Sequence, residues 1–171
     1  MTRTSRPLAL ALLAAAAACG TPRAETCPGA AVGVFTFVLE APDTGEEPRP
    51  FCARVPAEGT TVVGTFRAVL SSDPALGTAA VCVEGGRDLT QAYYGRVDGG
   101  AYAVSTSPGL AVLQACGPNC AAEATARIEG SVVEGAFDGS LTERFQHPRG
   151  DCGGCAFPCE AAYGLTGTPV P

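Results

Sequence analysis

The nine cysteines of this 171-residue chain constrain its fold more than any other feature of the sequence. Cys116 and Cys120 stand in a C-x3-C spacing around Gly-Pro-Asn, and a second group, Cys152, Cys155 and Cys159, places three thiols close together. In an oxidising compartment such neighbouring cysteines form disulfides, and each disulfide typically stabilises a fold by ~2–4 kcal/mol. The cysteines therefore predict a disulfide-stapled fold, provided that the chain is exported.

The N-terminus has the anatomy of an export signal. Arg3 and Arg6 form a positively charged region, and Leu8–Ala18 is an apolar run that ends in small residues. This run is too short to span a membrane as a helix, because a span takes about 20 apolar residues. We therefore expect residues 1–18 to be a signal peptide.

Cys19 follows directly after the run Ala14–Ala18, and this arrangement resembles the cleavage box of bacterial lipoprotein precursors. The resemblance implies cleavage just before Cys19, a diacylglyceryl group on its sulfur and an acyl group on its new amino terminus. Ala16 stands where the family usually has Leu. Ala16-x-Ala18 also fits an ordinary signal-peptidase site, and so does the segment that ends at Ala24, so plain secretion remains the alternative.

Lipidation of Cys19 would leave an even number of cysteines, as disulfides require. The eight disulfide candidates are Cys27, Cys52, Cys82, Cys116, Cys120, Cys152, Cys155 and Cys159. Eight cysteines allow 105 pairings, so their spacing does not give the connectivity. For one bridge we expect the local pair Cys116 with Cys120, while the other three join strands or the C-terminal loop.

Two other roles for the clustered cysteines remain open. Five thiolates could fill a tetrahedral zinc site, although paired C-x2-C knuckles are the usual spacing and only Cys152 and Cys155 have it. The same two residues could form a redox pair, but a catalytic pair usually opens a helix, and glycine-rich turn sequence surrounds this one. We expect structural disulfides, with no metal and no cofactor.

The chain beyond the signal has the pattern of short strands. Ala31–Leu39 is apolar on both alternating faces, which predicts a central strand buried on two sides. Ala41–Pro50 is rich in proline and acidic residues and predicts a solvated loop. Further strands are expected from near Thr61 to Leu70 and over Ala79–Glu84.

Two hairpins have clear turn signals. Tyr93–Val97 and Ala101–Ser105 flank Asp-Gly-Gly, whose glycines supply the positive φ that hairpin turns need. Ala126–Val132 and Phe137–Leu141 alternate apolar and polar residues on either side of Glu-Gly. Pairing Val132 with Phe137 places both apolar sets on one face, so this hairpin should have one buried and one solvated face.

No stretch of ten or more residues after the signal has the apolar stripe of an amphipathic helix. We predict an all-β fold: an antiparallel β-sandwich or a small β-barrel of about 8–10 short strands, stapled by disulfides, after an N-terminal signal helix. The expected organisation is a signal peptide at 1–18, a tether at 19–30 and a single all-β domain at 31–171.

Composition limits the partners. The chain has 17 acidic residues against 11 arginines, no lysine and a formal net charge of −6. Nucleic acids are therefore not expected as partners, because binding them requires clustered basic residues. Lysine-based chemistry is excluded, and no sequence motif of a common enzyme active site is present.

Few residues are candidates for catalysis. His147 is the only histidine; Asp151 lies nearby in sequence, but a lone histidine before proline predicts an exposed loop. The carboxylates are scattered and predict a solvated acidic surface. Those considered are Glu46, Glu47, Glu84, Asp88 and Asp138.

Tyr93, Tyr94 and Tyr102 cluster on the first hairpin and are the candidate binding patch. The alternative is that they pack across the sheet, which is the more common use of aromatic residues on neighbouring strands.

Together these patterns predict an exported, lipid-anchored protein of the cell envelope that acts as a non-enzymatic binding or structural module. Its expected partners are the membrane, through lipid on Cys19, and an envelope protein or small-molecule ligand. Position 20 is Gly rather than the aspartate of an inner-membrane retention signal, so the resemblance favours the outer membrane over the inner membrane. A secreted or periplasmic form is the alternative. The alternatives are an envelope thiol oxidoreductase, a metal-binding protein and a ligand-carrying barrel.

Overall fold

The computed structural model describes residues 27–42, 49–84 and 92–171. Within these ranges the chain forms nine strands and one 3-10 turn, η1 (Gln114–Cys116), and contains no α-helix. The strands are β1 (Ala30–Glu40), β2 (Val62–Asp73), β3 (Thr78–Val83), β4 (Ala92–Asp98), β5 (Ala101–Ser105), β6 (Gly109–Val112), β7 (Ala121–Val133), β8 (Ala136–Arg149) and β9 (Cys159–Pro169). The expected signal peptide, Cys19 and most of the expected tether lie outside the described residues.

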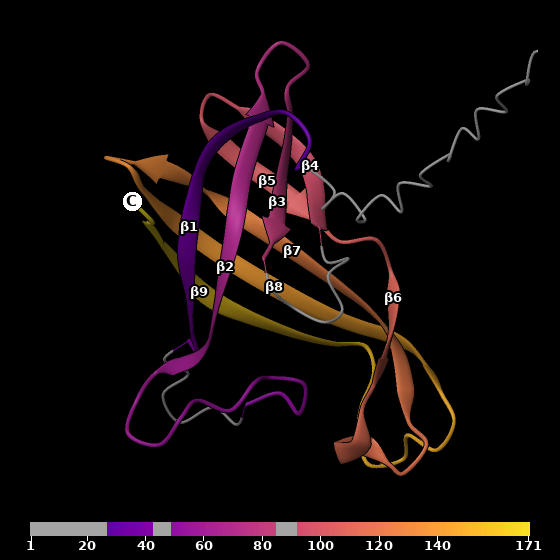
Figure 1. Ribbon diagram of the computed structural model, residues 1–171. Coiled ribbons are helices and arrows are strands. Elements are labelled where there is room, and N and C mark those ends of the chain that lie inside the picture. Colours follow the sequence, from indigo (N-terminus) through magenta and orange to yellow (C-terminus); the bar gives the residue numbers. More distant parts are fainter. Residues whose placement is uncertain (1–26, 43–48, 85–91) are drawn as a thin grey trace, which may run out of the picture.

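The strands form one antiparallel sheet that closes on itself (Figure 1). Consecutive strands pair from β1 to β5, β5 pairs with β7, and β7, β8 and β9 continue the sheet back to β1. β6 is outside this ring and pairs with β7 beyond the end of β5. The all-β prediction is confirmed, and of its two architectures the protein adopts the barrel, with eight strands, because the β5–β7 and β1–β9 pairings leave no pair of separate sheets.

The two ends of the barrel differ. Tight turns join β2 to β3, β4 to β5 and β7 to β8 at the turn end, whereas the longer connections, including those from β1 to β2 and from β8 to β9, lie at the loop end (Figure 1). The predicted hairpins are confirmed. Gly99 and Gly100 have φ values of 55° and 87°. Glu134 and Gly135 have φ values of 52° and 84°, so both two-residue turns have the positive φ angles of type I′.

The predicted register of the second hairpin is also confirmed, since Val132 pairs with Phe137. Every second residue of each strand points into the barrel, where bulky side chains fill the interior. Phe37 is fully buried, stacks on Phe66 at 5.0 Å between ring centroids, and meets Phe137 edge to face at 5.4 Å. The interior of this barrel is therefore a packed core over most of its length.

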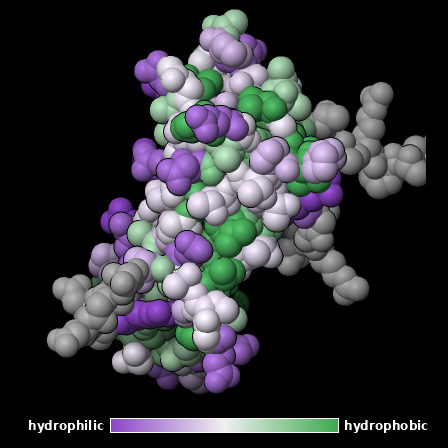
Figure 2. Space-filling view, turned by 90° about the vertical axis from the view of Figure 1, so that its left-hand side faces the viewer, coloured by the Kyte–Doolittle hydropathy of each residue, from purple (hydrophilic) through white to green (hydrophobic). Residues whose placement is uncertain are grey.

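The prediction of a strand buried on two sides is wrong for β1. Phe35, Phe37 and Leu39 are buried inside the barrel, but on the outer face Val32 is 43% exposed, and Val34 and Val38 are only partly covered. A barrel wall is one layer thick, so only its inner face meets a core. Figure 2 shows apolar side chains at the surface on the side of the barrel that it faces.

All eight cysteines from Cys27 onward form disulfides. The pairs are Cys27–Cys82, Cys52–Cys159, Cys116–Cys155 and Cys120–Cys152. The prediction of a local bridge between Cys116 and Cys120 is wrong. Backbone hydrogen bonds, including Cys120 N to Gly117 O at 3.2 Å, already close that turn, and both of its cysteines bond across to the β8–β9 connection.

We call the bridges Cys116–Cys155 and Cys120–Cys152 the double clamp. They join the segment before β7 to the β8–β9 connection at the loop end. On the outside of the wall, Cys27 bonds to Cys82 on β3, which fastens the end of the expected tether to the barrel. No helix in the described ranges is long and apolar enough to span a membrane.

Candidate functional site

The described part of the β1–β2 connection lies against the loop end of the barrel. The Cys52–Cys159 disulfide bonds it to the first residue of β9, and a hydrogen bond from Ala41 N to Thr61 O, at 2.8 Å, closes its base. These restraints hold Arg54, two residues after Cys52, over the barrel mouth.

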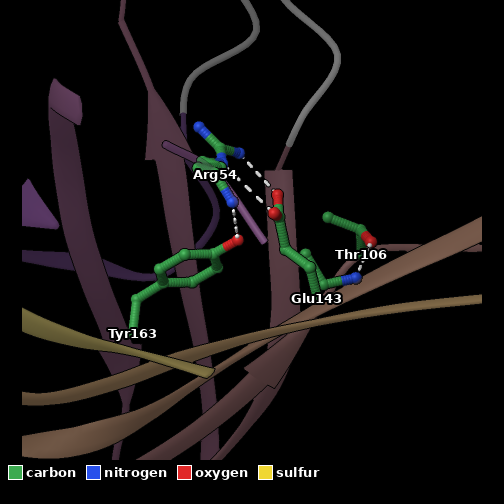
Figure 3. A network of polar contacts seen from close by, with 5 residues as sticks. Arg54, Thr106, Glu143 and Tyr163 are labelled. Carbon is green, nitrogen blue, oxygen red and sulfur yellow. Dashed lines mark hydrogen bonds and ion pairs between the residues drawn. The ribbon is translucent and has the colours of Figure 1, made fainter. Parts of the chain in front are cut away.

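Arg54 is the centre of a polar network at the mouth (Figure 3). Its Nε donates to Oε2 of Glu143 at 3.1 Å, and its Nη2 donates to Oε1 of the same carboxylate. Its backbone N–H donates to the hydroxyl oxygen of Tyr163 at 2.9 Å, and its guanidinium lies 6.0 Å from the centre of that ring. The network therefore ties the connection to β8 and β9 by side-chain and main-chain contacts together.

The alternation of β8 places Glu143 inside the barrel. Leu141 and Phe145, two residues to either side, share its inward register. The residues paired with Glu143 on the neighbouring strands are Ala126 and Ala161, whose small side chains leave space for a carboxylate. Its side chain is 15% exposed, and a charge in such a position requires a partner, which Arg54 supplies.

Thr106 closes the barrel wall beside this network, between β5 and β6. Its backbone N–H donates to Ala126 O at 2.9 Å, and its side-chain oxygen accepts a hydrogen bond from Ala126 N at 3.0 Å (Figure 3). These hydrogen bonds hold β7, whose Ala126 pairs with Glu143, at the point between the end of its ladder with β5 and the start of its ladder with β6.

The electrostatics of the mouth favour neutral hydroxyls and a compensated ion pair. The hydrogen bonds with Glu143 raise the pKa of Arg54 above its ordinary value, although burial opposes this. Burial raises the pKa of Tyr93, and the Glu143 carboxylate adds to the effect. Burial likewise raises the pKa of Tyr163, against the hydrogen bond from the Arg54 main chain. Both oxygens of Glu143 accept hydrogen bonds from Arg54, so the guanidinium compensates the charge of the inward carboxylate.

A small cavity lies inside the mouth, beside Arg54. Its volume is about 150 Å³. Its lining comes from β1, β2, β3, β4 and β8 together with the β1–β2 connection: Leu39, Arg54, Gly64, Thr65, Phe66, Val83, Tyr93 and Leu141. The Tyr93 hydroxyl makes no hydrogen bond with another described residue. The lining therefore combines apolar side chains with polar groups, among them the Arg54 guanidinium and the Tyr93 hydroxyl.

A larger depression of about 470 Å³ lies on the outer surface over β4, β5 and β7. The small side chains of Ala101 and Ala103 line it, together with the charged side chains of Arg96, Asp98 and Glu129. Charges of both signs border it.

The structure separates the three tyrosines of the candidate binding patch. Tyr93 and Tyr102 point into the barrel and are 5% and 7% exposed, whereas Tyr94 points outward and is 52% exposed. They do not form one surface patch, because neighbouring residues of a strand face opposite sides of the wall. Packing inside the sheet, which was the alternative, describes Tyr93 and Tyr102, and Tyr93 also lines the mouth cavity.

The clustered cysteines do not have the geometry of a redox pair or a zinc site. Cys152 and Cys155 bond to Cys120 and Cys116 rather than to each other. Their sulfurs are therefore not free thiolates. Among the described residues, no group of three or more His, Cys, Asp or Glu side chains is placed to hold a metal ion.

His147 lies within β8 rather than in the loop that the sequence predicts, although its side chain is 71% exposed as expected. His147 has a φ of 49° and lies where the register between β7 and β8 shifts. The shift is a β-bulge, and β8 continues beyond it to Arg149. The Nδ1 of His147 lies 3.5 Å from Oε2 of Glu123. A hydrogen bond from Gln146, more than the contact with His147, lowers the pKa of Glu123.

The carboxylates considered from the sequence do not come together in the described ranges. Glu84 forms an ion pair with Arg67 at 2.8 Å, and Asp138 is exposed on β8. Glu46, Glu47 and Asp88 lie outside the described residues.

Sequence reasoning missed Arg54, Glu143 and Tyr163. One signal for Glu143 was present: counting by two from Phe137 through Leu141 reaches Glu143 on the apolar register. A charged residue at an inward position predicts a buried partner. No local pattern marked Arg54, because its position depends on a disulfide to a residue 107 positions from Cys52.

These features define a class: a small, closed, up-and-down β-barrel stapled by four disulfides, with an ion pair and a small cavity at one end. In comparisons with known proteins no family model matches this chain, and neither a curated protein nor a solved structure matches it.

Proposed function

We propose that this protein is an exported, lipid-anchored component of a bacterial cell envelope, in which the barrel acts as a non-enzymatic binding or structural module. The observation that carries the proposal is that all eight cysteines from Cys27 onward are paired in disulfides. Such bridges persist in oxidising compartments outside the cytoplasm.

The pairing also bears on Cys19. Because the other eight cysteines bond among themselves, none of them is available as a partner for Cys19. A lipid on its sulfur accounts for the odd cysteine of an exported chain. Acyl chains contribute ~0.8 kcal/mol for each buried CH₂, so a multiply acylated Cys19 would hold the barrel on the membrane. The outer membrane is the favoured site, with periplasmic or secreted protein as the alternatives.

A non-enzymatic role fits the chemistry of the described residues. The inward carboxylate of Glu143 is engaged by Arg54, and the clustered sulfurs are oxidised. A second candidate role, carriage of a small ligand, is favoured by the cavity of about 150 Å³ at the barrel mouth.

Intact mass spectrometry of the protein from its native membrane fraction tests the proposal. We expect a chain that begins at Cys19, carries acyl mass and takes up no alkylating reagent until it is reduced. A Cys19→Ala variant should lose the acyl mass and the membrane association while its other cysteines stay resistant to alkylation. A chain without acyl mass, or with reactive thiols before reduction, would overturn the proposal.

A further inference from the structure

The size of the mouth cavity sets the size of what it can hold. Its volume of about 150 Å³ equals that of an engineered apolar protein cavity that binds benzene. The cavity is open to solvent at the barrel mouth, and a single six-membered ring with one small substituent would fill its volume.

Part of the cavity wall is apolar and suits the faces of a ring. Leu39, Phe66, Val83 and Leu141 lie on four different strands, and each presents its side chain to the interior. Gly64 extends the space, because a Cβ built there meets no atom closer than Nη1 of Arg54, at 3.9 Å. An occupant would bury its faces against rigid strands, which gives binding without the cost of ordering a loop.

The polar groups of the cavity call for one oxygen on the occupant. Nη1 of Arg54 stands next to Gly64, and only Nε, Nη2 and the main-chain N–H of Arg54 are engaged by Glu143 and Tyr163. The Tyr93 hydroxyl lies on the same cavity. A hydroxyl or carbonyl oxygen could accept from Arg54 and also exchange a hydrogen bond with Tyr93.

The charges at the mouth disfavour an anion. Glu143 already neutralises the guanidinium of Arg54 with a two-point hydrogen bond. A second carboxylate beside Arg54 would be repelled by Glu143 and would lose its own hydration. The occupant should therefore be uncharged.

We propose that the barrel mouth binds a small neutral cyclic molecule of about the size of phenol, with its ring against Leu39, Phe66 and Leu141 and its single oxygen between Arg54 and Tyr93. This inference rests on the binding role proposed above and assigns it a site and a ligand class. It does not depend on the lipid at Cys19, so the mass measurement and the binding measurement can fail separately.

The test is an NMR titration of the purified full-length protein with phenol and, separately, with benzoate; protein-free micelles serve as the blank if detergent is needed. Phenol should produce saturable shifts at the cavity residues, with a dissociation constant on the order of 1 mM. Benzoate should bind more weakly than phenol, by about tenfold or more.

Two glycine variants sharpen the test. Gly64→Leu fills the cavity and should weaken phenol binding by about tenfold or more. Gly164→Leu is the matched control, because Gly164 lies on the outer face of β9 and a Cβ there also meets no atom closer than 3.9 Å. Phenol binding should be unchanged in this control.

Three results would overturn the proposal: no saturable phenol binding, phenol binding that Gly64→Leu leaves intact, or benzoate binding as tight as that of phenol. If Gly64→Leu does not fold, the unmodified protein still decides the matter. Phenol shifts must then cluster at Leu39, Tyr93, Leu141 and Arg54, and shifts scattered over the surface would contradict the site.

Discussion

The double clamp allows a quantitative prediction about nested disulfides. We consider removing one of its bridges, Cys120–Cys152, by replacing both cysteines with alanine, and compare this with removing Cys52–Cys159 in the same way. The two bridges close loops that differ in sequence separation, 32 residues against 107. A larger loop loses more unfolded-state entropy when it is closed.

The separation of 32 overstates the effect of Cys120–Cys152. While Cys116–Cys155 stays closed, the second bridge of the clamp closes a ring of only about nine residues. Removing it should therefore lower the free energy of unfolding by ~2.6 kcal/mol. Removing Cys52–Cys159 opens a ring of about 70 residues along the shortest covalent path and should cost ~4.4 kcal/mol. Removing both clamp bridges should cost ~6.5 kcal/mol, which is more than twice the single loss, because the last bridge then opens a long loop.

Urea unfolding followed by far-UV circular dichroism, with linear extrapolation to water, measures these differences. All variants change Cys to Ala, so the loss of sulfur packing is matched in kind. If removal of Cys120–Cys152 costs as much as removal of Cys52–Cys159, or if the two clamp bridges are additive, the nested-loop reasoning is refuted. A double-clamp variant that does not fold agrees with it, since total stability is typically ~5–15 kcal/mol.

Three further predictions concern side chains. Arg54→Met should lower the free energy of unfolding in urea by ~1–2 kcal/mol, because it leaves the Glu143 carboxylate without a partner; this magnitude allows for the 47% exposure of the Arg54 side chain. Adding Glu143→Gln should recover most of the loss, and a double variant less stable than the single one would contradict the ion-pair role. Burial raises the pKa of Tyr93, so the contribution of its neutral hydroxyl to stability is complete below pH ~10 and is lost as the pH rises through the folded-state pKa. A spectrophotometric titration should show a tyrosine that ionises at higher pH than the others and that Tyr93→Phe removes; an unchanged titration curve would refute this. Gln146→Ala should raise the pKa of Glu123 in an NMR titration, since the Gln146 hydrogen bond is the largest cause of the lowered value, and no change would assign that effect elsewhere.

Much of the fold was predictable because strand alternation and turn chemistry are local. The pairing of Val132 with Phe137 followed from an alternating pattern on either side of Glu134–Gly135, and the structure has that register. The β4–β5 hairpin followed from glycines that accept positive φ. These signals need no knowledge of the rest of the chain.

The candidate site was not predictable to the same degree. Arg54, Glu143 and Tyr163 come from a connection and two strands that are far apart in sequence, and they meet only because the barrel closes. Tyr94 and Tyr93, adjacent in sequence, end on opposite sides of the wall. Proximity in sequence was therefore a poor guide to which residues share a surface.

The sequence by itself determined that this chain is all-β, where two hairpins turn and that its cysteines can staple it, because backbone conformation and pair formation depend on local residue types. The tertiary structure alone decided that the sheet closes into a barrel and that the double clamp replaces the expected local bridge. It also decided that Arg54 neutralises an inward Glu143 beside a small cavity. The physical reason is that closure, disulfide partners and buried ion pairs depend on distances between residues far apart in the chain, and those distances are set only when the strands have packed around one core.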